Sequence, residues 1–418
     1  MALDETQIEA LQARGVILHA PASTTIRGVP AENFEEGVEI YGGVTICGPR
    51  SRFGARTELG RAGGGFFENV ACGRDVKIYG GIAENCALLD GVTFRGHAEI
   101  RGGTLLEEGC EGAHHVGYKM TVMLPWVVAG SMVNFCDALV AGGTSRKNHS
   151  EIGSSLALYN FTPWGDKHAS LFGDVPRGVF LREAPVFIGG QTQIVSPVSV
   201  GFGCVIPAGY ALRRDLPDGR IYGEAPTSID QPFDAEALGA LRPKLLTGLK
   251  FLGNLVALKA WYRDVRKQTQ QDDAHLQAVY DMAIEQLDAG IQERTKRLRA
   301  LLARVPASRE AHARALEARA DGLSFAQRYR RLDDHDLVLK QNDALLSHLQ
   351  AIDDGDFLPN APIPALQAIA DAFPSDAASF VEWVRDTLDD TLRQHAQKAL
   401  QNIVDRCAAR ELLPLPPK

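Results

Sequence analysis

The sequence is poor in cysteine and has no excess of positive charge. Seven cysteines occur in 418 residues, and no two of them have the CxxC spacing of zinc ribbons or redox pairs. We therefore expect reduced thiols in the interior of a cytoplasmic protein. The formal net charge of −8 argues against a nucleic-acid-binding protein, because the phosphate backbone favours clustered Lys and Arg.

The sequence also lacks a long hydrophobic run. Its most apolar stretch, residues 120–135, is short and is interrupted by Pro125, Gly130 and Asn134, so it cannot span a bilayer. The acidic start of the chain is unlike the basic start of a signal peptide. The motifs of phosphate-binding loops, serine hydrolases and HExxH proteases are absent as well. We expect neither a membrane nor a nucleic acid as a partner.

What the sequence has in abundance is a six-residue repeat of apolar positions. The unbroken series is Val70, Val76, Ile82, Leu88, Phe94, Ile100 and Leu106. Shorter series with the same spacing are Val38 and Val44, then Val186, Thr192, Val198, Cys204, Tyr210 and Leu216. Glycine and turn residues fill the gaps, which excludes a continuous helix. Short strands separated by turns predict a β-solenoid over residues 16–232, with three six-residue units per coil and the repeated residue pointing inward.

Two kinds of segment interrupt or precede this solenoid. Residues 1–15 are predicted as an N-terminal helix, with Asp4 or Thr6 near its start and Gly15 just past its end. The six-residue register breaks over residues 111–134 and again over 160–185. We expect both stretches to leave the solenoid as loops, and loops on a rigid scaffold often carry binding residues.

Beyond residue 233 the apolar spacing becomes that of helices, which predicts an all-α domain over residues 233–418. Three stripes carry the pattern: Leu245, Leu249, Leu252, Val256 and Trp261; Leu276, Val279, Ala283, Leu287 and Ile291; and Phe380, Trp383, Val384, Leu388 and Leu392, the last in one long helix. Pro306, Gly322, Pro362 and Pro374 are expected at helix ends. The stripes can pack on one another or on the solenoid, or they can bind a protein partner.

A more specific pattern covers about seventy residues. It consists of SRKNHSEIG at 145–153, YNF at 159–161, Lys167, VFIGGQTQIVSPVSVG at 186–201, AG at 208–209 and RD at 214–215. This pattern resembles the acetyltransferase half of the bifunctional bacterial N-acetylglucosamine-1-phosphate uridyltransferases. Members of that family are trimeric, left-handed parallel β-helices of hexapeptide repeats that bind acetyl-CoA between subunits. The resemblance therefore implies a left-handed coil, a homotrimer and acetyl-CoA as co-substrate.

The resemblance also implies roles for single residues. His149 stands where the family has its general base, which removes a proton from a sugar ammonium before the nitrogen attacks the thioester. Imidazole, with an ordinary pKa of about 6.5, suits that task at neutral pH. Asn160 and Lys167 match positions near the sugar substrate, and Gly190 and Ala208 match positions that line the coenzyme pocket.

Three cations in the same segment could pair with phosphates, since guanidinium and ammonium groups suit phosphate oxygens. Arg146 and Lys147 lie beside His149, on the substrate side, and Arg214 lies on the coenzyme side. Four histidines, His114, His115, His149 and His168, raise the question of a metal site. They lack the His-x4-His pattern of metalloenzymes built on such repeats, so no metal is expected.

The sequence departs from the family at positions that bear on the substrate. Residues 135–138 (FCDA) contain no cation where the family has a lysine-rich strand, and Ser150 and Glu151 replace an aromatic residue. Three hypotheses follow. The first is CoA-dependent acyl transfer to an amino-sugar phosphate or a sugar-nucleotide-like acceptor. The second is a non-catalytic β-helix that binds a sugar nucleotide or scaffolds a partner. The third, phosphosugar nucleotidyl transfer, is disfavoured because no glycine-rich nucleotide loop precedes the repeats.

Overall fold

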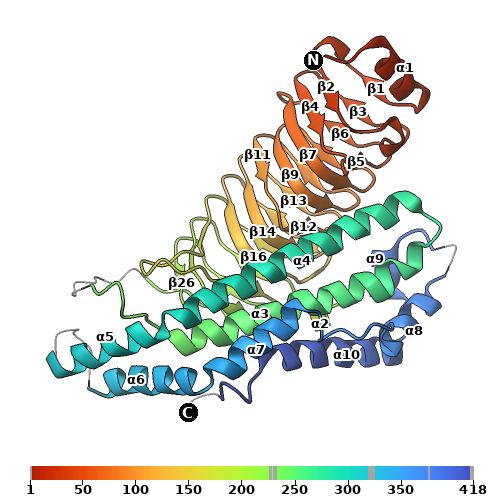
Figure 1. Cartoon of the computed structure of the whole chain (residues 1–418). Coiled ribbons are helices and arrows are strands. Elements are labelled where there is room, and N and C mark those ends of the chain that lie inside the picture. The colour runs from red at the N-terminus through yellow and green to blue at the C-terminus, as the bar shows by residue number, and fades with distance from the viewer. Residues whose placement is uncertain (1, 226–227, 229–232, 319–324, 375–376, 415–418) are drawn as a thin grey trace.

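The computed structural model describes residues 2–225, 228, 233–318, 325–374 and 377–414. A parallel β-solenoid is followed by a helical region that lies along its side (Figure 1). The first helix, α1 (Glu5–Ala13), sits at the free end of the solenoid, where Asp4 caps it in a capping box with Gln7. Gly15, with a φ of 80°, follows the end of α1. The predicted N-terminal helix is therefore present.

Each coil of the solenoid has three sides, which we call the first, second and third faces. The first face is the ten-stranded sheet of β1 (Ile17–Leu18), β3 (Glu39–Ile40), β6 (Glu58–Leu59), β8 (Lys77–Ile78), β10 (Thr93–Phe94), β13 (Glu111–Gly112), β15 (Val128–Ala129), β19 (Glu151–Ile152), β22 (Phe187–Ile188) and β25 (Val205–Ile206). All of its neighbouring strands pair in parallel.

The second face runs through β2 (Thr25–Arg27), β4 (Val44–Cys47), β7 (Gly65–Cys72), β9 (Gly81–Leu88), β11 (Ala98–Ile100), β14 (Gly117–Met123), β16 (Asn134–Val140), β20 (Ala157–Tyr159), β23 (Gln193–Val195) and β26 (Ala211–Leu212). Four of these strands, β7, β9, β14 and β16, each turn a corner at one residue with left-handed backbone. These residues are Asn69, Asn85, Met120 and Asp137 in that order. The second halves of these strands join β5 (Arg52–Phe53), β12 (Thr104–Leu106), β21 (Ser170–Phe172) and β24 (Ser199–Val200) as the third face.

The six-residue repeat predicts the interior of the coil with two exceptions. Every other member of the series is buried, but Ile82 and Tyr210 are each 43% exposed. The exception at Ile82 has a geometric cause: Lys77 pairs with Thr93, sixteen residues further on, whereas Thr93 pairs with Glu111, eighteen residues further on. Because this coil is shorter, the inward-pointing position of the strand moves by one residue, and Ala83 rather than Ile82 points inward.

The loop expected at residues 111–134 is not there. The chain instead forms β13, β14 and β15 in register with the neighbouring coils. Glu111 pairs with Val128, seventeen residues further on, so one residue is missing from the repeat and the corner absorbs the loss. The break in the sequence pattern therefore marks a shortened corner and not a departure from the solenoid.

The chain does leave the solenoid at three other places. A hairpin of β17 (Gly143–Ser145) and β18 (Asn148–His149) projects between the third and first faces. Within the predicted excursion at 160–185, an antiparallel bridge joins Phe161 to Lys167, and a short helix, α2 (Val175–Gly178), follows β21. The strand β21 itself belongs to the third face, so this excursion is two loops and not one.

The helical region contains α3 (Leu241–Trp261), which continues through a π-helical turn to Arg266, then α4 (Ala274–Ala303), α5 (Val305–Ala318), α6 (Phe325–Lys340), α7 (Asn342–Asp353), α8 (Pro364–Ala372), α9 (Phe380–Asp386) and α10 (Asp390–Ala408). The stripe beginning at Phe380 therefore belongs to two helices, α9 and α10, and the prediction of one long helix is wrong. Asp389 caps the second of them. Pro306, Pro362 and Pro374 lie at helix ends as expected, whereas Gly322 lies outside the described residues.

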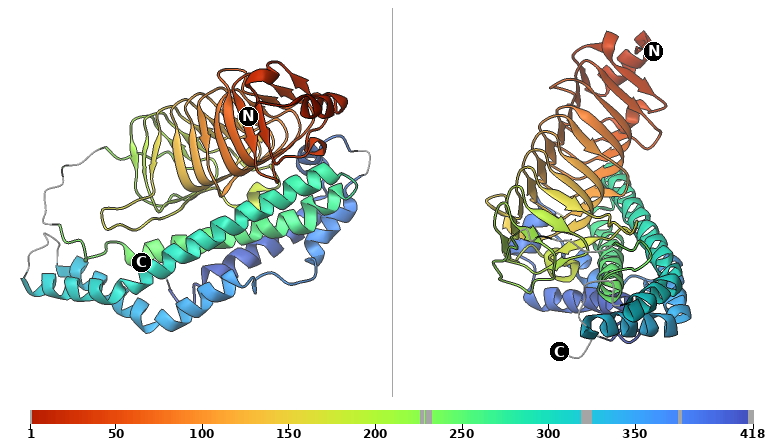
Figure 2. Two further views of the ribbon diagram at one scale, coloured as in Figure 1. Left: turned by 45° about the horizontal axis from the view of Figure 1, so that its top comes forward. Right: turned by 90° about the vertical axis from the view of Figure 1, so that its left-hand side faces the viewer.

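The predicted stripes of α3 and α4 are buried against the third face (Figures 1 and 2). Outward side chains of that face form one row in register, the third-face row: Arg52, Ala71, Ala87, Leu105, Val122, Leu139, Leu171 and Ser199. From Ala71 to Leu171 every member is at most 3% exposed and shares one apolar cluster with the helices. Burial of each larger side chain contributes roughly 1.5–3 kcal/mol, so the helices and this face form one core.

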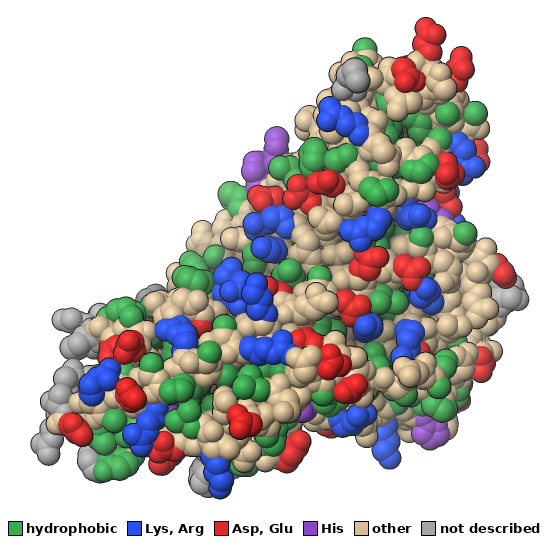
Figure 3. Space-filling model, viewed as in Figure 1, with side chains coloured by type: hydrophobic (Ala, Val, Ile, Leu, Met, Phe, Trp, Pro, Cys, Tyr) green, Lys and Arg blue, Asp and Glu red, His purple; other side chains and the backbone are tan. Residues whose placement is uncertain are grey.

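The opposite surface of the helices is polar. Figure 3 shows Lys and Arg side chains interspersed with Asp and Glu over the helical region on the face in view. Among the described residues, no helix combines the length and the apolar character that crossing a membrane requires. All seven cysteines are free thiols. The left-handed sense of the coil stays a prediction from the family resemblance.

Candidate active site

His149 lies on the β17–β18 hairpin, where the chain enters the first face. Its Nδ1 is 2.8 Å from the carbonyl oxygen of Arg146, and its Nε2 is 2.9 Å from the Glu151 carboxylate. Each ring nitrogen thus has one hydrogen-bond partner, a carbonyl oxygen at Nδ1 and a carboxylate at Nε2. The His149 side chain is 26% exposed, so the pair is reachable from solvent.

The helical region supports the base of this hairpin. The Arg385 guanidinium, on α9, donates to the Thr144 carbonyl oxygen at 2.8 Å and lies 5.4 Å from the centre of the Trp126 ring. These two contacts tie the hairpin to both the helices and the preceding coil. The position of His149 is therefore set by residues far apart in the sequence.

Arg146, a predicted phosphate ligand, is already paired. Its guanidinium forms an ion pair with Glu111 and donates to the Gly109 carbonyl oxygen at 3.1 Å. Lys147, its neighbour, is exposed. The hairpin thus offers Lys147 to a ligand directly, whereas Arg146 would have to exchange Glu111, and His149 would have to exchange Glu151, for a ligand group.

Asn160 and Lys167 lie at a different corner, between the second and third faces, where β20 ends. Asn160 donates to the Asp137 carboxylate, which also accepts from the buried Arg294 of α4. Arg294 donates in addition to the Lys167 carbonyl oxygen at 2.9 Å. Asp137 is the left-handed corner residue of β16, a conformation that Asp and Asn adopt more readily than most residues. Asp137 thus stands where the family has cations because it adopts the left-handed corner conformation and pairs with Arg294.

A second buried cluster fixes the remainder of this loop. Asp166 accepts from Thr162, from His168 and from Lys244 of α3, the last at 2.6 Å. Burial opposes ionisation of Asp166, but these hydrogen bonds outweigh it and hold the pKa of the carboxyl well below its usual range. Burial lowers the pKa of His168 despite Asp166. This histidine is therefore part of a structural cluster at the foot of the loop.

Two of the three predicted coenzyme residues, Gly190 and Ala208, occupy the corner between the first and second faces. Gly190 follows β22 and Ala208 follows β25, and Gly209 N donates to the Gly190 carbonyl oxygen at 2.9 Å across the stacked coils. A Cβ at Gly189 would lie 2.3 Å from Ala208 N, so the coils are too close there for a side chain. Arg214 is at the next corner, with its guanidinium 4.1 Å above the Tyr222 ring.

The structure does not bring all the predicted residues together within one chain. His149 precedes the first face and Gly190 follows it, so the strand separates them by roughly five extended residues, or about 16 Å. Asn160 and Lys167 lie at the corner between the second and third faces. Among the described residues, no group of three or more His, Cys, Asp or Glu side chains is arranged to hold a metal ion.

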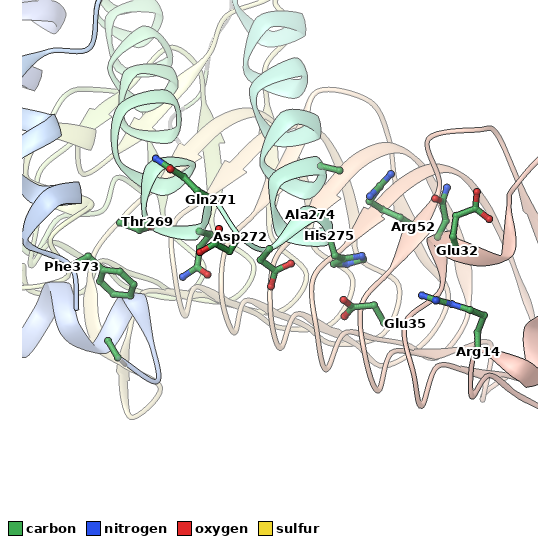
Figure 4. A pocket seen from close by; sticks show the side chains of 15 residues that line it. Arg14, Glu32, Glu35, Arg52, Thr269, Gln271, Asp272, Ala274, His275 and Phe373 are labelled. Carbon is green, nitrogen blue, oxygen red and sulfur yellow. The ribbon is translucent and has the colours of Figure 1, made fainter. Parts of the chain in front are cut away.

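A cavity of about 920 Å³ lies elsewhere, between the first coils and the start of α4 (Figure 4). Figure 4 shows Arg52, from the solenoid, and Arg14, at the end of α1, on the same side of the cavity as His275. His275 hydrogen-bonds to the Cys72 carbonyl oxygen at 2.8 Å, and Glu35 pairs with Arg74. Along the third-face row this cavity lies five coils, or about 24 Å, from the coil that carries His149. It is a polar wedge where the helices diverge from the solenoid, remote from every predicted site residue.

Sequence reasoning missed the residues that orient the predicted ones. Glu151 was visible only as a departure from the family, yet it contacts the histidine. Arg294 and Lys244 belong to the helical region, and no motif links them to residues more than seventy positions earlier. One signal was available for Lys244, which is a cation within an apolar stretch of a helix, and such a cation needs a carboxylate or a ligand.

Comparisons with known proteins agree with the solenoid. No protein-family model matches the chain. The bifunctional protein GlmU of Nitratidesulfovibrio vulgaris is 28% identical over 204 residues, which is 49% of this chain and 40% of that protein. GlmU of Acidithiobacillus ferrooxidans is 28% identical over 218 residues, 51% of this chain and 42% of that protein. The chain thus spans about two fifths of the length of these relatives.

Among solved structures, the polysialic acid O-acetyltransferase OatWY aligns with 51% of this chain and 90% of its own, at 8% identity and a TM-score of 0.15. A TM-score that low carries no weight. The sequence similarity and the parallel solenoid, taken together, do carry weight. The β-solenoid of this chain is related to the hexapeptide-repeat acyltransferases, and among them to the GlmU proteins.

Proposed function

We propose that this protein transfers an acyl group, acetyl in the simplest case, from coenzyme A to an amino-sugar phosphate or sugar-nucleotide-like acceptor in the cytoplasm. The observation that supports this most is the arrangement of His149 in a solenoid similar to GlmU. Another His–Glu pair, His19 and Glu39, occurs on the first face, so such a pair alone carries no function. His149 differs because its Nδ1 is held by a backbone carbonyl and because its surroundings match the family.

In this proposal His149 is the general base. With Nδ1–H fixed on the Arg146 carbonyl oxygen, the neutral imidazole has its lone pair on Nε2. In the resting structure Nε2 contacts the Glu151 carboxylate, so the acceptor must take the place of that carboxylate at Nε2. Nε2 can then take a proton from the amine or hydroxyl that attacks the thioester carbonyl. Glu151, close by, stabilises the imidazolium that forms.

The loop between the second and third faces that carries Asn160 and Lys167 provides contacts suited to a sugar-like acceptor. Tyr159 and Phe161 flank Asn160 and are 49% and 58% exposed. Exposed aromatic faces beside an amide and the Lys167 ammonium offer stacking, hydrogen bonds and charge to a phosphorylated sugar. The Asn160 amide nitrogen is engaged by Asp137, so its carbonyl oxygen is the group proposed for the acceptor.

Acetyl-CoA, in this proposal, lies along the first face near Gly190 and Ala208, with Arg214 near its phosphates. Because Gly190 and Ala208 lie at one edge of the first face and His149 lies at the other, a single chain holds only part of the site. A homotrimer would complete it by placing the coenzyme corner of one chain against the His149 hairpin of the next. The third face is covered by the chain's own helices, which leaves the first and second faces for such contacts.

A non-catalytic role is the second candidate, and one observation favours it. Arg146 and Asn160 are both satisfied by carboxylates of the same chain. A β-helix with these groups engaged could bind a sugar nucleotide weakly or serve as a scaffold, with the helical region as the surface for a protein partner. Nucleotidyl transfer is the least supported, since only about two fifths of each GlmU relative is matched.

The test is an acyl-transfer assay with acetyl-CoA and a panel of amino-sugar phosphates and sugar nucleotides, with detection of released CoA. His149→Ala should lower turnover by about 10²–10⁴-fold. His19→Ala, which removes the other His–Glu pair of the first face, is the matched control and should have no effect. Equal turnover of wild type and His149→Ala would exclude His149 as the base. Acetyl-CoA binding without transfer to any acceptor would favour the non-catalytic role.

A further inference from the structure

A cavity of about 470 Å³ lies where the last coils of the solenoid meet the helices; we call it the α3 cleft. Ser199 and Asp215 come from the solenoid. Arg242 and Lys250 come from α3, Arg330 comes from α6, and Arg410 follows the end of α10. The cleft belongs to the third face, whereas His149 lies on the hairpin that leads into the first face. It is therefore separate from the proposed acyl-transfer site.

Lys250 is the central group of the α3 cleft. Its Nζ donates to the Ser199 hydroxyl at 2.8 Å, and among the described residues no carboxylate is close enough to form an ion pair with it. Burial lowers the pKa of Lys250, with Arg410 and Arg177 acting in the same direction against Asp174 and Asp215. Lys250 is partly buried, and Asp174 and Asp215 act on it only from beyond ion-pair distance. A partly buried ammonium that no carboxylate contacts costs stability, so a chain retains one chiefly where a ligand supplies the contacting negative charge.

The other cations of the cleft also have few hydrogen-bond or carboxylate partners. The Arg242 side chain is 9% exposed, and one of its terminal nitrogens donates to Asp334 at 3.3 Å. Its Nε is buried without a hydrogen-bond partner. Arg330 and Arg410 are exposed at the rim. Four cationic groups thus face two carboxylates, those of Asp215 and Asp334, in a protein whose net charge is −8.

The lining of the cleft indicates what kind of anion fits. Pro243, Leu246 and Ala408 form an apolar wall beside the cations. A free inorganic ion would leave that wall in contact with water, whereas an organic phosphate covers it. We infer that the α3 cleft binds a phosphorylated organic molecule, with its phosphoryl group between Lys250, Arg242 and Arg410. This inference goes beyond the proposed function and does not depend on it.

A binding role and a structural role of Lys250 predict opposite changes in stability. If Lys250 mainly holds the helices to the solenoid through Ser199, then Lys250→Met should lower the melting temperature. If it is retained for a ligand, Lys250→Met removes an uncompensated charge, keeps the aliphatic stem, and should leave the melting temperature unchanged or raise it. The same substitution should weaken anion binding. Stability and affinity measured on one variant therefore separate the two roles.

The experiment is a calorimetric titration of the full chain with ADP, and separately with inorganic phosphate. We expect ADP to bind more tightly than phosphate because only ADP covers the apolar wall. Lys250→Met should weaken ADP binding at least about tenfold, and Arg410→Ser, at an exposed position, should weaken it several-fold. Arg309→Ser is the control, because Arg309 is an exposed arginine of α5 paired with Asp336.

Three results would overturn the inference. The first is no binding of ADP at millimolar concentration. The second is equal ADP affinity in wild type, Lys250→Met and Arg410→Ser. The third is equal affinity for phosphate and ADP, which would mean that the cleft selects only a simple anion. Should Lys250→Met fail to fold, Arg410→Ser still decides the outcome. Acetyl-CoA, titrated into Arg410→Ser, should bind as it does to wild type, so failure of the proposed function and failure of this inference are distinguishable.

Discussion

The first and third faces of the solenoid share the same interior and differ only in what points outward. The outward row of the first face is Ile17, Glu39, Glu58, Lys77, Thr93, Glu111, Val128, Glu151, Phe187 and Val205. Its charged members form ion pairs within the chain, such as Lys77 with Glu58. The third-face row is apolar from Ala71 to Leu171 and lies beneath the helices. The inward residues make the coil, and the outward residues decide which face is covered.

The largest expected effect comes from a charge placed on each face of one coil. Val122 and Val128 are the outward valines of the third and first faces, and Val122 is 3% exposed. Val122→Lys should lower the free energy of unfolding by about 3 kcal/mol or more, because it buries an unpaired ammonium under α4. Val128→Lys, between Glu111 and Glu151, should change it by about 0.5 kcal/mol or less. Urea denaturation compares the two, and equal losses would show that the faces do not differ.

The next effect concerns the buried ion pair between the helices and the solenoid. Arg294→Met leaves the Asp137 carboxylate buried without its guanidinium and should cost about 3 kcal/mol of unfolding free energy. Adding Asp137→Asn removes the stranded charge and should recover more than half of that loss. The urea midpoints of wild type and of the single and double variants provide the measurement. No recovery in the double variant would mean that Arg294 acts only through its packing.

The pH dependence of stability should come partly from Glu107, at the same interface. Burial, reinforced by Glu108 and opposed by Arg266 and the Tyr262 hydroxyl, raises the pKa of Glu107 from 4.5 to about 8. The folded state thus binds a proton that the unfolded state loses above pH 4.5. Stability from this group is full below pH 4.5, declines as pH rises to about 8, and is lost above it.

Glu107→Gln should remove that decline. We expect the variant to be more stable than wild type at pH 8, by at least about 1 kcal/mol, and to have a flatter profile between pH 5 and 8. Thermal unfolding across this range measures the difference. Parallel profiles for the two proteins would show that Glu107 is ionised when folded, contrary to the burial argument.

The smallest effect is expected on the first face. The Arg146 and Glu111 side chains are 55% and 26% exposed, and a pair so accessible to water contributes about 0.2–1 kcal/mol. Arg146→Ala and Glu111→Ala, analysed as a double-mutant cycle, should give a coupling energy in that range that shrinks in salt. A coupling energy as large as that of the buried Arg294–Asp137 pair would show that ion pairs on the exposed first face are as strong as those beneath the helices.

Much of the solenoid could be predicted, because a coil needs one inward apolar residue about every six positions. The exceptions arise at corners, which absorb insertions and deletions without breaking the sheets. The coil after Lys77 is short, so Ile82 points outward, and the coil after Glu111 is one residue shorter than the coil before it, so 111–134 looked like a loop. The covering of the third face could not be predicted, since it depends on which outward residues align across many coils.

The candidate site was predictable only where the family motif covered it. The position of His149 before the first face and the stacking of Gly190 and Ala208 follow from the repeat. The carboxylates that contact Arg146 and Asn160 do not follow from the repeat. They belong to Glu111 and Asp137, which lie one or two coils earlier and carry no motif. Arg294 and Lys250 come from helices whose docking is set by apolar packing, so their neighbours emerge only from the three-dimensional structure.

The central claim is that the first face of this solenoid serves acyl-CoA chemistry while the third is used for packing. The most direct test is a calorimetric titration of the purified protein with acetyl-CoA, with free CoA as the comparison. We predict binding at micromolar strength that is unchanged in Arg410→Ser, which places it outside the α3 cleft. No binding of acetyl-CoA at millimolar concentration would contradict the claim and leave the similarity to GlmU as one of fold alone.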